Sequence, residues 1–287
     1  MSSDIPFLKM NGLGNDFVVV DSRQSGRRFD RAAVKAISDR RSGVGCDQFI
    51  VLESPRAHGA DVFMRIYNAD GGEIDACGNA SRCVAALVAE ERDVGSVTLE
   101  TNAGLLAAEV RGPAVTVDMG KPRFDWDQIP LAEPFADTTG IELQIGPIDA
   151  PLLHTPSVAN VGNPHAIFWV DDVDRYDLGR FGPMLENHPI FPERANISLA
   201  QVIDREHIKV RVWERGAGLT LACGTAACAV AVAAARKGLS KRKVTVALPG
   251  GPLLIEWRAS DDHILMTGPW SLDGDGVLPR GLVADAA

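Results

Sequence analysis

The sequence predicts an α+β protein of two homologous halves, each an antiparallel β-sheet or barrel wrapped around a buried central helix. The prediction rests on a stretch that occurs twice. Each copy begins with an Arg, reaches a Cys-Gly pair twelve residues later and continues as an apolar run, from Arg65 to Cys77 and from Arg211 to Cys223. We interpret each copy as a strand, a glycine-rich loop and a helix that begins at the cysteine. Such an apolar helix is expected to be buried, and the repeat predicts a pseudo-two-fold axis.

The first half is expected at residues 1–122. Residues 7–21 predict a short strand, a glycine turn and a strong strand of β-branched residues. Residues 30–41 predict an amphipathic helix with Asp30 as its N-cap. The remaining pattern predicts a glycine turn and strand at 43–53, a strand at 61–68, a helix from Cys77 to about residue 90, and an antiparallel series at 96–101, 105–110 and 114–119.

The second half is expected at residues 151–273, because the order of patterns repeats there. The Gly-Asn pair at 14–15 returns at 162–163, and strands are expected at 194–202, 207–213, 243–248, 251–257 and 263–267 around a helix from Cys223. Residues 123–150 are rich in Pro and Asp and lack periodicity, which predicts a linker region. The tail at 274–287 is a candidate to pack back on the first half.

The composition excludes several classes of protein. Hydrophobic residues make up 46% and charged residues 23% of the chain, as in soluble globular proteins. The net charge of −9 argues against a nucleic-acid partner. The opening has no basic flank or long apolar core, so we expect no signal peptide, and no apolar run predicts a membrane span.

The five cysteines predict thiols in a reducing cytoplasm, because their number is odd and no secretion signal is expected. No CxxC motif is present, and neither cysteine pair on the predicted helices shares a helix face, so we expect no metal site. Cys46 and Cys83 are interpreted as buried core residues.

Cys77 and Cys223 are different, because each is placed at a helix start. The partial positive charge there favours a thiolate and lowers the pKa of a cysteine. The unpaired backbone N–H groups of the same turn can hold a substrate carboxylate. Two such thiols, aimed at one carbon from opposite sides, would remove a proton from one face and return one to the other. The repeat therefore suggests inversion of a carbon centre.

Several motifs together resemble the diaminopimelate epimerases, a family of cofactor-independent amino-acid epimerases. The resemblance covers nearly the whole chain. Its motifs are GLGNDF at 12–17, GVGCDQ at 43–48, NADG at 68–71 before ACGN at 76–79, VGNPH at 161–165, and ERGAG at 214–218 before ACGT at 222–225.

The resemblance implies a homodimer that needs no pyridoxal phosphate and interconverts LL- and meso-diaminopimelate, for lysine and cell-wall precursor synthesis. It implies that Cys77 and Cys223 are the catalytic acid and base and that His165 and Glu214 tune the thiols. The residues implied to bind substrate are Asn15, Gln48, Asn68, Gly78, Asn79, Asn163, Asn196, Glu214, Arg215, Gly224 and Thr225. Leu219, Asn11, Ala80 and Ser81 depart from the family pattern and affect the expected substrate contacts, not the reaction type.

Other interpretations remain open on the residues alone. Asn15 suits a turn, His165 a satisfied structural histidine, and Glu214 with Arg215 a solvated ion pair. A proline or hydroxyproline epimerase of the same two-thiol class would need no clamp for a distal amino-acid end. A non-catalytic amino-acid-binding protein would need neither thiol. A thiol oxidoreductase is disfavoured by the lack of CxxC.

Overall fold

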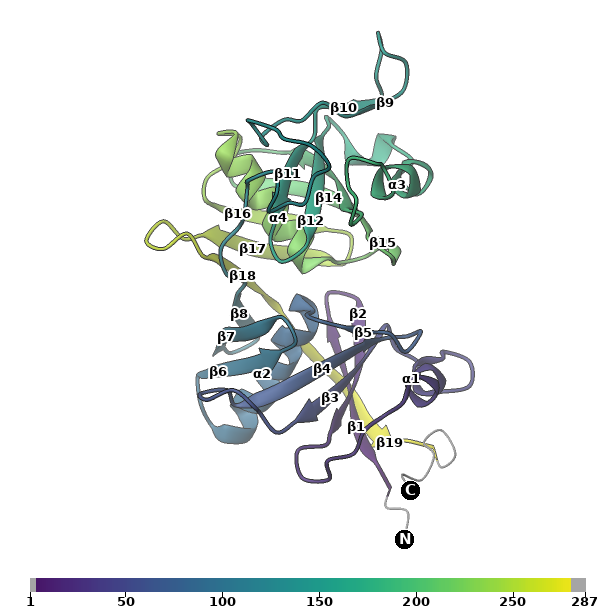
Figure 1. Cartoon of the computed structure of the whole chain (residues 1–287). Coiled ribbons are helices and arrows are strands. Elements are labelled where there is room, and N and C mark those ends of the chain that lie inside the picture. Colours follow the sequence, from purple (N-terminus) through teal and green to yellow (C-terminus); the bar gives the residue numbers. More distant parts are fainter. Residues whose placement is uncertain (1–3, 280–287) are drawn as a thin grey trace. The chain divides into compact units, whose positions relative to one another are not determined.

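The computed structural model describes residues 4–279, which fold into two compact units (Figure 1). Of the described residues, unit 1 combines 4–117 with 268–279, and unit 2 is Asp118–Thr267. The chain therefore leaves unit 1 once and returns to it near its end. The part of the tail that returns includes the strand β19 (Ser271–Val277), which pairs antiparallel with the first strand, β1 (Pro6–Gly12).

Unit 1 contains a sheet with the strand order β19-β1-β2-β3-β4-β6-β7-β8, and the short β5 pairs with β4. The predicted helix at 30–41 is present but ends at Ser38. Asp30 caps it by accepting a hydrogen bond of 2.7 Å from the backbone nitrogen of Ala33, as predicted. The other elements are β2 (Asn15–Asp21), α1 (Arg31–Ser38), β3 (Gln48–Glu53), β4 (Val62–Asn68), β5 (Glu73–Ile74), α2 (Gly78–Arg92), β6 (Ser96–Thr101), β7 (Gly104–Arg111) and β8 (Ala114–Asp118).

Unit 2 repeats this pairing pattern, with the order β11-β12-β13-β14-β16-β17-β18 and the short β15 on β14. In both units the central helix follows a long strand, a turn and a short strand, so the predicted duplication is confirmed. Its elements are β9 (Gln144–Ile145), β10 (Leu153–His154), β11 (Ser157–Asn160), β12 (Pro164–Trp169), the 3₁₀ helix η1 (Val173–Arg175), α3 (Leu178–Glu186), β13 (Asn196–Val202), β14 (His207–Glu214), β15 (Gly218–Thr220), α4 (Gly224–Arg236), β16 (Lys243–Leu248), β17 (Gly251–Trp257) and β18 (Ile264–Pro269).

The sheets are mixed, whereas we expected antiparallel ones. The hairpins are antiparallel, but β2 pairs parallel with β3, and β4 with β6. The equivalent pairs of unit 2, β12 with β13 and β14 with β16, are parallel too. Each parallel pair is joined by a connection that contains a helix, and parallel strands require such a crossover. The sequence pattern of single strands does not reveal this pairing.

The helices α2 and α4 are the central helices of their units, as predicted (Figure 1). Eleven of the fifteen residues of α2 and ten of the thirteen of α4 are buried. α2 packs against β1, β6 and β7, and α4 against strands that include β11, β12, β16 and β17. Alanines on most faces of α4 let these strands approach closely. Both helices begin directly after the repeated cysteine.

The predicted linker at 123–150 is integrated into unit 2. Its apolar residues Ile129, Leu131, Ile141 and Leu143 belong to the same buried cluster as Phe168 and other residues of that unit. The segment has little regular structure apart from β9, which pairs with β10 beyond its end, and this explains why the segment lacks periodicity. Periodicity in a sequence indicates regular elements, and this segment is buried without forming long ones.

Candidate active site

Cys77 and Cys223 are the N-cap residues of α2 and α4. Both have extended backbone dihedrals, with φ −147° and ψ 111° at Cys77 and φ −129° and ψ 109° at Cys223, and neither side chain caps its helix. The first turn of each helix, Gly78-Asn79 and Gly224-Thr225, provides the backbone N–H groups that form anion sites in proteins.

In unit 1, the side chain of Asn15 lies beside Cys77. The Asn15 Oδ1 atom is 3.9 Å from Cys77 Sγ and 3.4 Å from Asn79 Nδ2. Asn79 is buried, and its own Oδ1 accepts a hydrogen bond of 3.0 Å from the guanidinium of Arg82. The first residue of β2 and the first turn of α2 are thus connected by amide side chains.

The strand register brings three of the predicted polar residues together at the same end of neighbouring strands in the unit 1 sheet. Asn15 begins β2, Gln48 begins the parallel strand β3, and Asn68 ends the antiparallel strand β4. Gln48 and Asn68 are register partners, and Gln48 Nε2 donates to Asn68 Oδ1 at 3.2 Å. Among the described residues, the buried Gln48 Oε1 has no hydrogen-bond partner. We name Asn15, Gln48, Asn68, Cys77 and Asn79 the unit 1 half-site.

Unit 2 places Asn163, Asn196 and Glu214 at the corresponding strand ends. Asn196 begins β13, which is parallel to β12, and Glu214 ends β14, the antiparallel neighbour of β13. Arg215 follows Glu214, and its backbone nitrogen donates to Asn196 Oδ1 at 3.0 Å. Its guanidinium donates to the backbone oxygen of Glu193 at 2.9 Å. Together with Cys223, His165 and Thr225 these residues form the unit 2 half-site.

The surroundings of Cys223 oppose the lowering of its pKa that a helix start favours. The residue is 5% exposed, and its Sγ lies 3.4 Å from Thr225 Oγ1. Burial raises the pKa of the Cys223 thiol well above its ordinary value, and the negative charge of the hydrogen-bonded Glu214 raises it further. The backbone N–H of Ala226 in the first turn of α4 lowers the pKa of Cys223, but burial and Glu214 outweigh it, so the expected net lowering of this pKa is wrong for Cys223. In unit 2 as it stands, Cys223 is a thiol at neutral pH.

His165 is fully buried and holds the side chain of Asn163. Its Nε2 is 2.7 Å from Asn163 Oδ1, and since that oxygen only accepts, Nε2 carries the proton. Burial, followed by the charge of Arg215, lowers the pKa of His165 to about 3. The imidazole is neutral at physiological pH, and its Nδ1 has no partner within the described range. Its direct contact is with an amide that belongs to the unit 2 half-site.

Glu186 supports the turn that carries Glu214 and Arg215, and no sequence pattern predicted this role. This carboxylate is 5% exposed. It accepts hydrogen bonds from the backbone nitrogen of Gly216 (2.9 Å) and from Trp213 Nε1 (2.7 Å), and pairs with Arg194 (3.1 Å). Glu186 ends α3, a helix whose two glycines and Pro183 oppose helix formation. A charged residue at the end of such a segment is expected to be exposed, so its burial could not be predicted.

The described part of the chain shows neither a candidate metal cluster nor a candidate membrane helix. Between residues 4 and 279 no group of three or more His, Cys, Asp or Glu side chains is arranged to hold a metal ion. No helix in that range is long and apolar enough to cross a membrane. All five cysteines lie within it, and none forms a disulfide.

Solved structures with this fold include amino-acid epimerases. A hydroxyproline epimerase from Agrobacterium vitis aligns with a TM-score of 0.69 and 15% identity, covering 99% of this chain and 96% of that one. A protein described as a predicted epimerase from Pseudomonas aeruginosa aligns with a TM-score of 0.67 and 19% identity, covering 97% of this chain and 100% of that one. The chain thus has the two-domain fold of this group of structures.

Sequence relatives define the family within that fold. The family model for diaminopimelate epimerase matches residues 7–125 and 157–272. The diaminopimelate epimerase of Afipia carboxidovorans is 58% identical over 284 residues, which cover 98% of this chain and 97% of that protein. That of a Bradyrhizobium species is 57% identical over 285 residues with the same coverage. The chain belongs to the diaminopimelate epimerase family.

Proposed function

We propose that the protein interconverts LL- and meso-diaminopimelate by a two-base proton transfer between Cys77 and Cys223. The observation that supports this most strongly is the repetition of one half-site. Each unit places a cysteine at the start of a buried helix. In each unit, amide or carboxylate side chains lie at the equivalent ends of neighbouring strands. Membership of the diaminopimelate epimerase family supports the choice of substrate.

In this proposal the thiols begin in different protonation states. Because burial and Glu214 keep Cys223 protonated, Cys223 supplies the proton in the direction that starts from this state. Cys77 is more exposed and acts as the base that removes the α-proton. The two thiols exchange protonation states in each turnover, so the reverse reaction starts from the other state.

The proposed chemistry needs strong stabilisation of the carbanion-like transition state, because the α-carbon is a very weak acid. General acid–base groups contribute about 10²–10⁴-fold. The rest is assigned to backbone N–H groups of the helix starts, directed at the reacting carboxylate in a water-excluded site. Arg215 and the side chains of Asn68, Asn163 and Asn196 are proposed to hold the distal amino-acid end, since Arg grips a carboxylate in a bidentate manner.

The decisive experiment follows deuterium in the product. Reduced protein is incubated in D₂O with LL-diaminopimelate, and NMR records deuterium and configuration at both α-carbons. We expect deuterium at one centre together with the meso isomer, and a loss of both in Cys77→Ala and in Cys223→Ala. Exchange with proline or hydroxyproline instead would retain the mechanism and replace the substrate. Binding without exchange of any amino acid would indicate a non-catalytic binding protein.

The proposal includes a homodimer that functions in the cytoplasm without pyridoxal phosphate. The two thiols together provide both proton transfers, and this supports independence of a carbonyl cofactor. The odd number of cysteines supports a reducing compartment. Sedimentation velocity measures the protomer number directly, and full activity after treatment with a carbonyl reagent is the expected result for the cofactor.

A further inference from the structure

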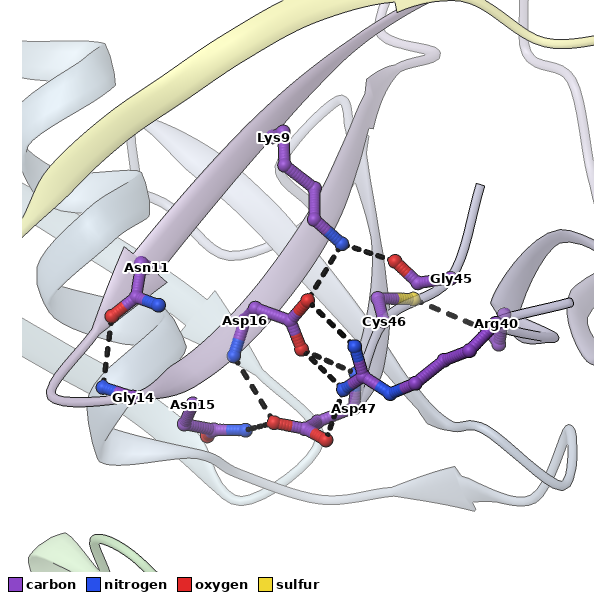
Figure 2. A network of polar contacts seen from close by, with 10 residues as sticks. Lys9, Asn11, Gly14, Asn15, Asp16, Arg40, Gly45, Cys46 and Asp47 are labelled. Carbon is purple, nitrogen blue, oxygen red and sulfur yellow. Dashed lines mark hydrogen bonds and ion pairs between the residues drawn. The ribbon is translucent and has the colours of Figure 1, made fainter. Parts of the chain in front are cut away.

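A network of charged side chains contacts Asn15 in unit 1 (Figure 2). The Oδ2 atom of Asp47 accepts hydrogen bonds from Asn15 Nδ2 (3.0 Å) and from the backbone nitrogen of Asp16 (3.1 Å). Its Oδ1 atom accepts from the guanidinium of Arg40 (2.7 Å). Every one of these contacts brings a donor to the carboxylate, and an ionised carboxylate has no proton to give in return.

The position of Asp47 is itself fixed by the rest of the network. Arg40 also donates to Asp16 at 2.7 Å, and Lys9 forms an ion pair with Asp16 at 2.7 Å. The backbone nitrogen of Asp47 donates to the Asp16 side chain at 3.0 Å. Burial alone would raise the pKa of Asp16, but the hydrogen bonds from Arg40 and Lys9 outweigh it and hold that pKa far below its usual range. Asp16 therefore stays ionised at neutral pH.

The network determines which end of the Asn15 amide faces Cys77. Because Asp47 only accepts, the NH₂ group of Asn15 must turn toward it, and Oδ1 must point the other way. There it lies 3.4 Å from Asn79 Nδ2 and 3.9 Å from Cys77 Sγ. The orientation of Asn79 is set independently, since Arg82 donates to its Oδ1. Both neighbours of Asn15 therefore require the same amide orientation.

We propose that Asp47, held by Arg40 and Asp16, is a positioning residue that keeps the carbonyl oxygen of Asn15 directed at Cys77. A carbonyl oxygen beside the sulfur favours the S–H form and disfavours the thiolate. The thiolate of Cys77 thus stays strongly basic, as removal of a weakly acidic α-proton demands. This consequence for catalysis rests on the proposed function, whereas the contacts belong to unit 1 alone.

The test measures the pH dependence of iodoacetamide alkylation at Cys77 in the full-length protein, by mass spectrometry. Asp47→Asn replaces the carboxylate by an amide that tolerates either orientation of Asn15. With N–H toward the sulfur, the thiolate is favoured, and we expect the alkylation midpoint to fall by about one pH unit. Asp47→Glu keeps an acceptor-only carboxylate and should restore most of the wild-type midpoint. The Asp47 side chain is 43% exposed, so its replacement should not prevent folding. Asp47→Ser is a second variant, for which the same fall in the alkylation midpoint is expected as for Asp47→Asn.

A double-mutant control separates orientation from simple loss of charge. Asp47→Asn is repeated in an Asn15→Ala background, where no further shift is expected if Asp47 acts through Asn15. An equal shift in both backgrounds would overturn the proposal, because Asp47 would then act on Cys77 through space.

Alkylation requires no substrate, so this inference and the proposed function fail separately. A shifted midpoint in a protein that epimerises no amino acid would keep the positioning role of Asp47 and reject the function. An unchanged midpoint in Asp47→Asn, in a protein that does epimerise diaminopimelate, would keep the function and reject the role of Asp47.

Discussion

The two repeated cysteines have nearly the same local sequence but different surroundings. Cys77 is half-buried beside the amide oxygen of Asn15, and Cys223 is 5% exposed beside the carboxylate of Glu214. A motif of Cys-Gly at a helix start predicts a lowered pKa for both thiols. At Cys223, burial and a charge from a different strand raise the pKa instead. The sequence specifies the helix start, whereas the neighbours that decide the pKa come from the folded unit.

His165 should make the stability of the protein depend on pH. Its pKa is lowered to about 3 in the folded state, against about 6.5 when unfolded, so below pH 6.5 the unfolded state binds more protons. The stabilisation is present above pH 6.5 and is lost as the pH falls toward 3. The free energy of unfolding is measured in urea at about pH 7.5 and about pH 5. Between these two pH values it should fall by about 2 kcal/mol more in wild type than in His165→Gln, which keeps a donor for Asn163. Equal losses in the two proteins would refute this assignment.

The helix α3 illustrates which elements the sequence predicts and which it does not. Strands and helices with clear periodicity, such as α2, were predicted close to their observed bounds. α3 was not, because it contains Gly179, Gly182 and Pro183, which oppose a helix. The structure explains Gly182, since a Cβ there would lie 2.4 Å from the ring of Trp213. Helix and strand approach so closely that Trp213 reaches Glu186 at the end of the helix, and this long-range contact has no local signal.

Replacing Glu186 should loosen the turn after β14. Glu186→Gln removes one acceptor, so Trp213 Nε1 or the Gly216 nitrogen loses its buried partner, at a cost of about 1–3 kcal/mol. Hydrogen exchange should increase at 214–218, and the KM for substrate should rise more than kcat falls, because Arg215 is proposed to bind the distal end. Arg194→Gln is the matched control. It removes only the ion pair of a 53% exposed arginine, which is worth ~0–1 kcal/mol.

At the scale of the molecule, the duplication could be predicted because it repeats patterns at one offset along the chain. Gly14-Asn15 matches Gly162-Asn163, and β2 and β12 begin at or directly after these Asn residues. The parallel pairings and the integration of residues 123–150 into unit 2 could not be predicted, since both depend on contacts between distant segments. The return of the chain to unit 1 is different, because the tail at 274–287 was a candidate to pack back on the first half. Its described part contains the end of β19, which pairs with β1, and residues 280–287 lie outside the described residues.

Unit 1 should therefore depend on the end of the chain, whereas unit 2 should not. β19 pairs with β1 from Pro6 to Asn11, and Leu278 is 4% exposed within the apolar cluster that includes Val18 and Phe49. A chain that ends at Trp270 keeps β18 but exposes one edge of β1 and part of this core. Loss of a buried Leu side chain alone costs about 2–5 kcal/mol. Hydrogen exchange should rise at β1 and at its neighbour β2.

The strands of unit 2 serve as the internal control in that experiment. β12, β13 and β14 pair with one another and make no pairing with β19, so their amides should keep the protection they have in the full-length chain. Faster exchange throughout both units would mean that the two fold as one cooperative structure. Undiminished protection at β1 would mean that β2 and α2 suffice to hold this strand, and that β19 contributes little to unit 1.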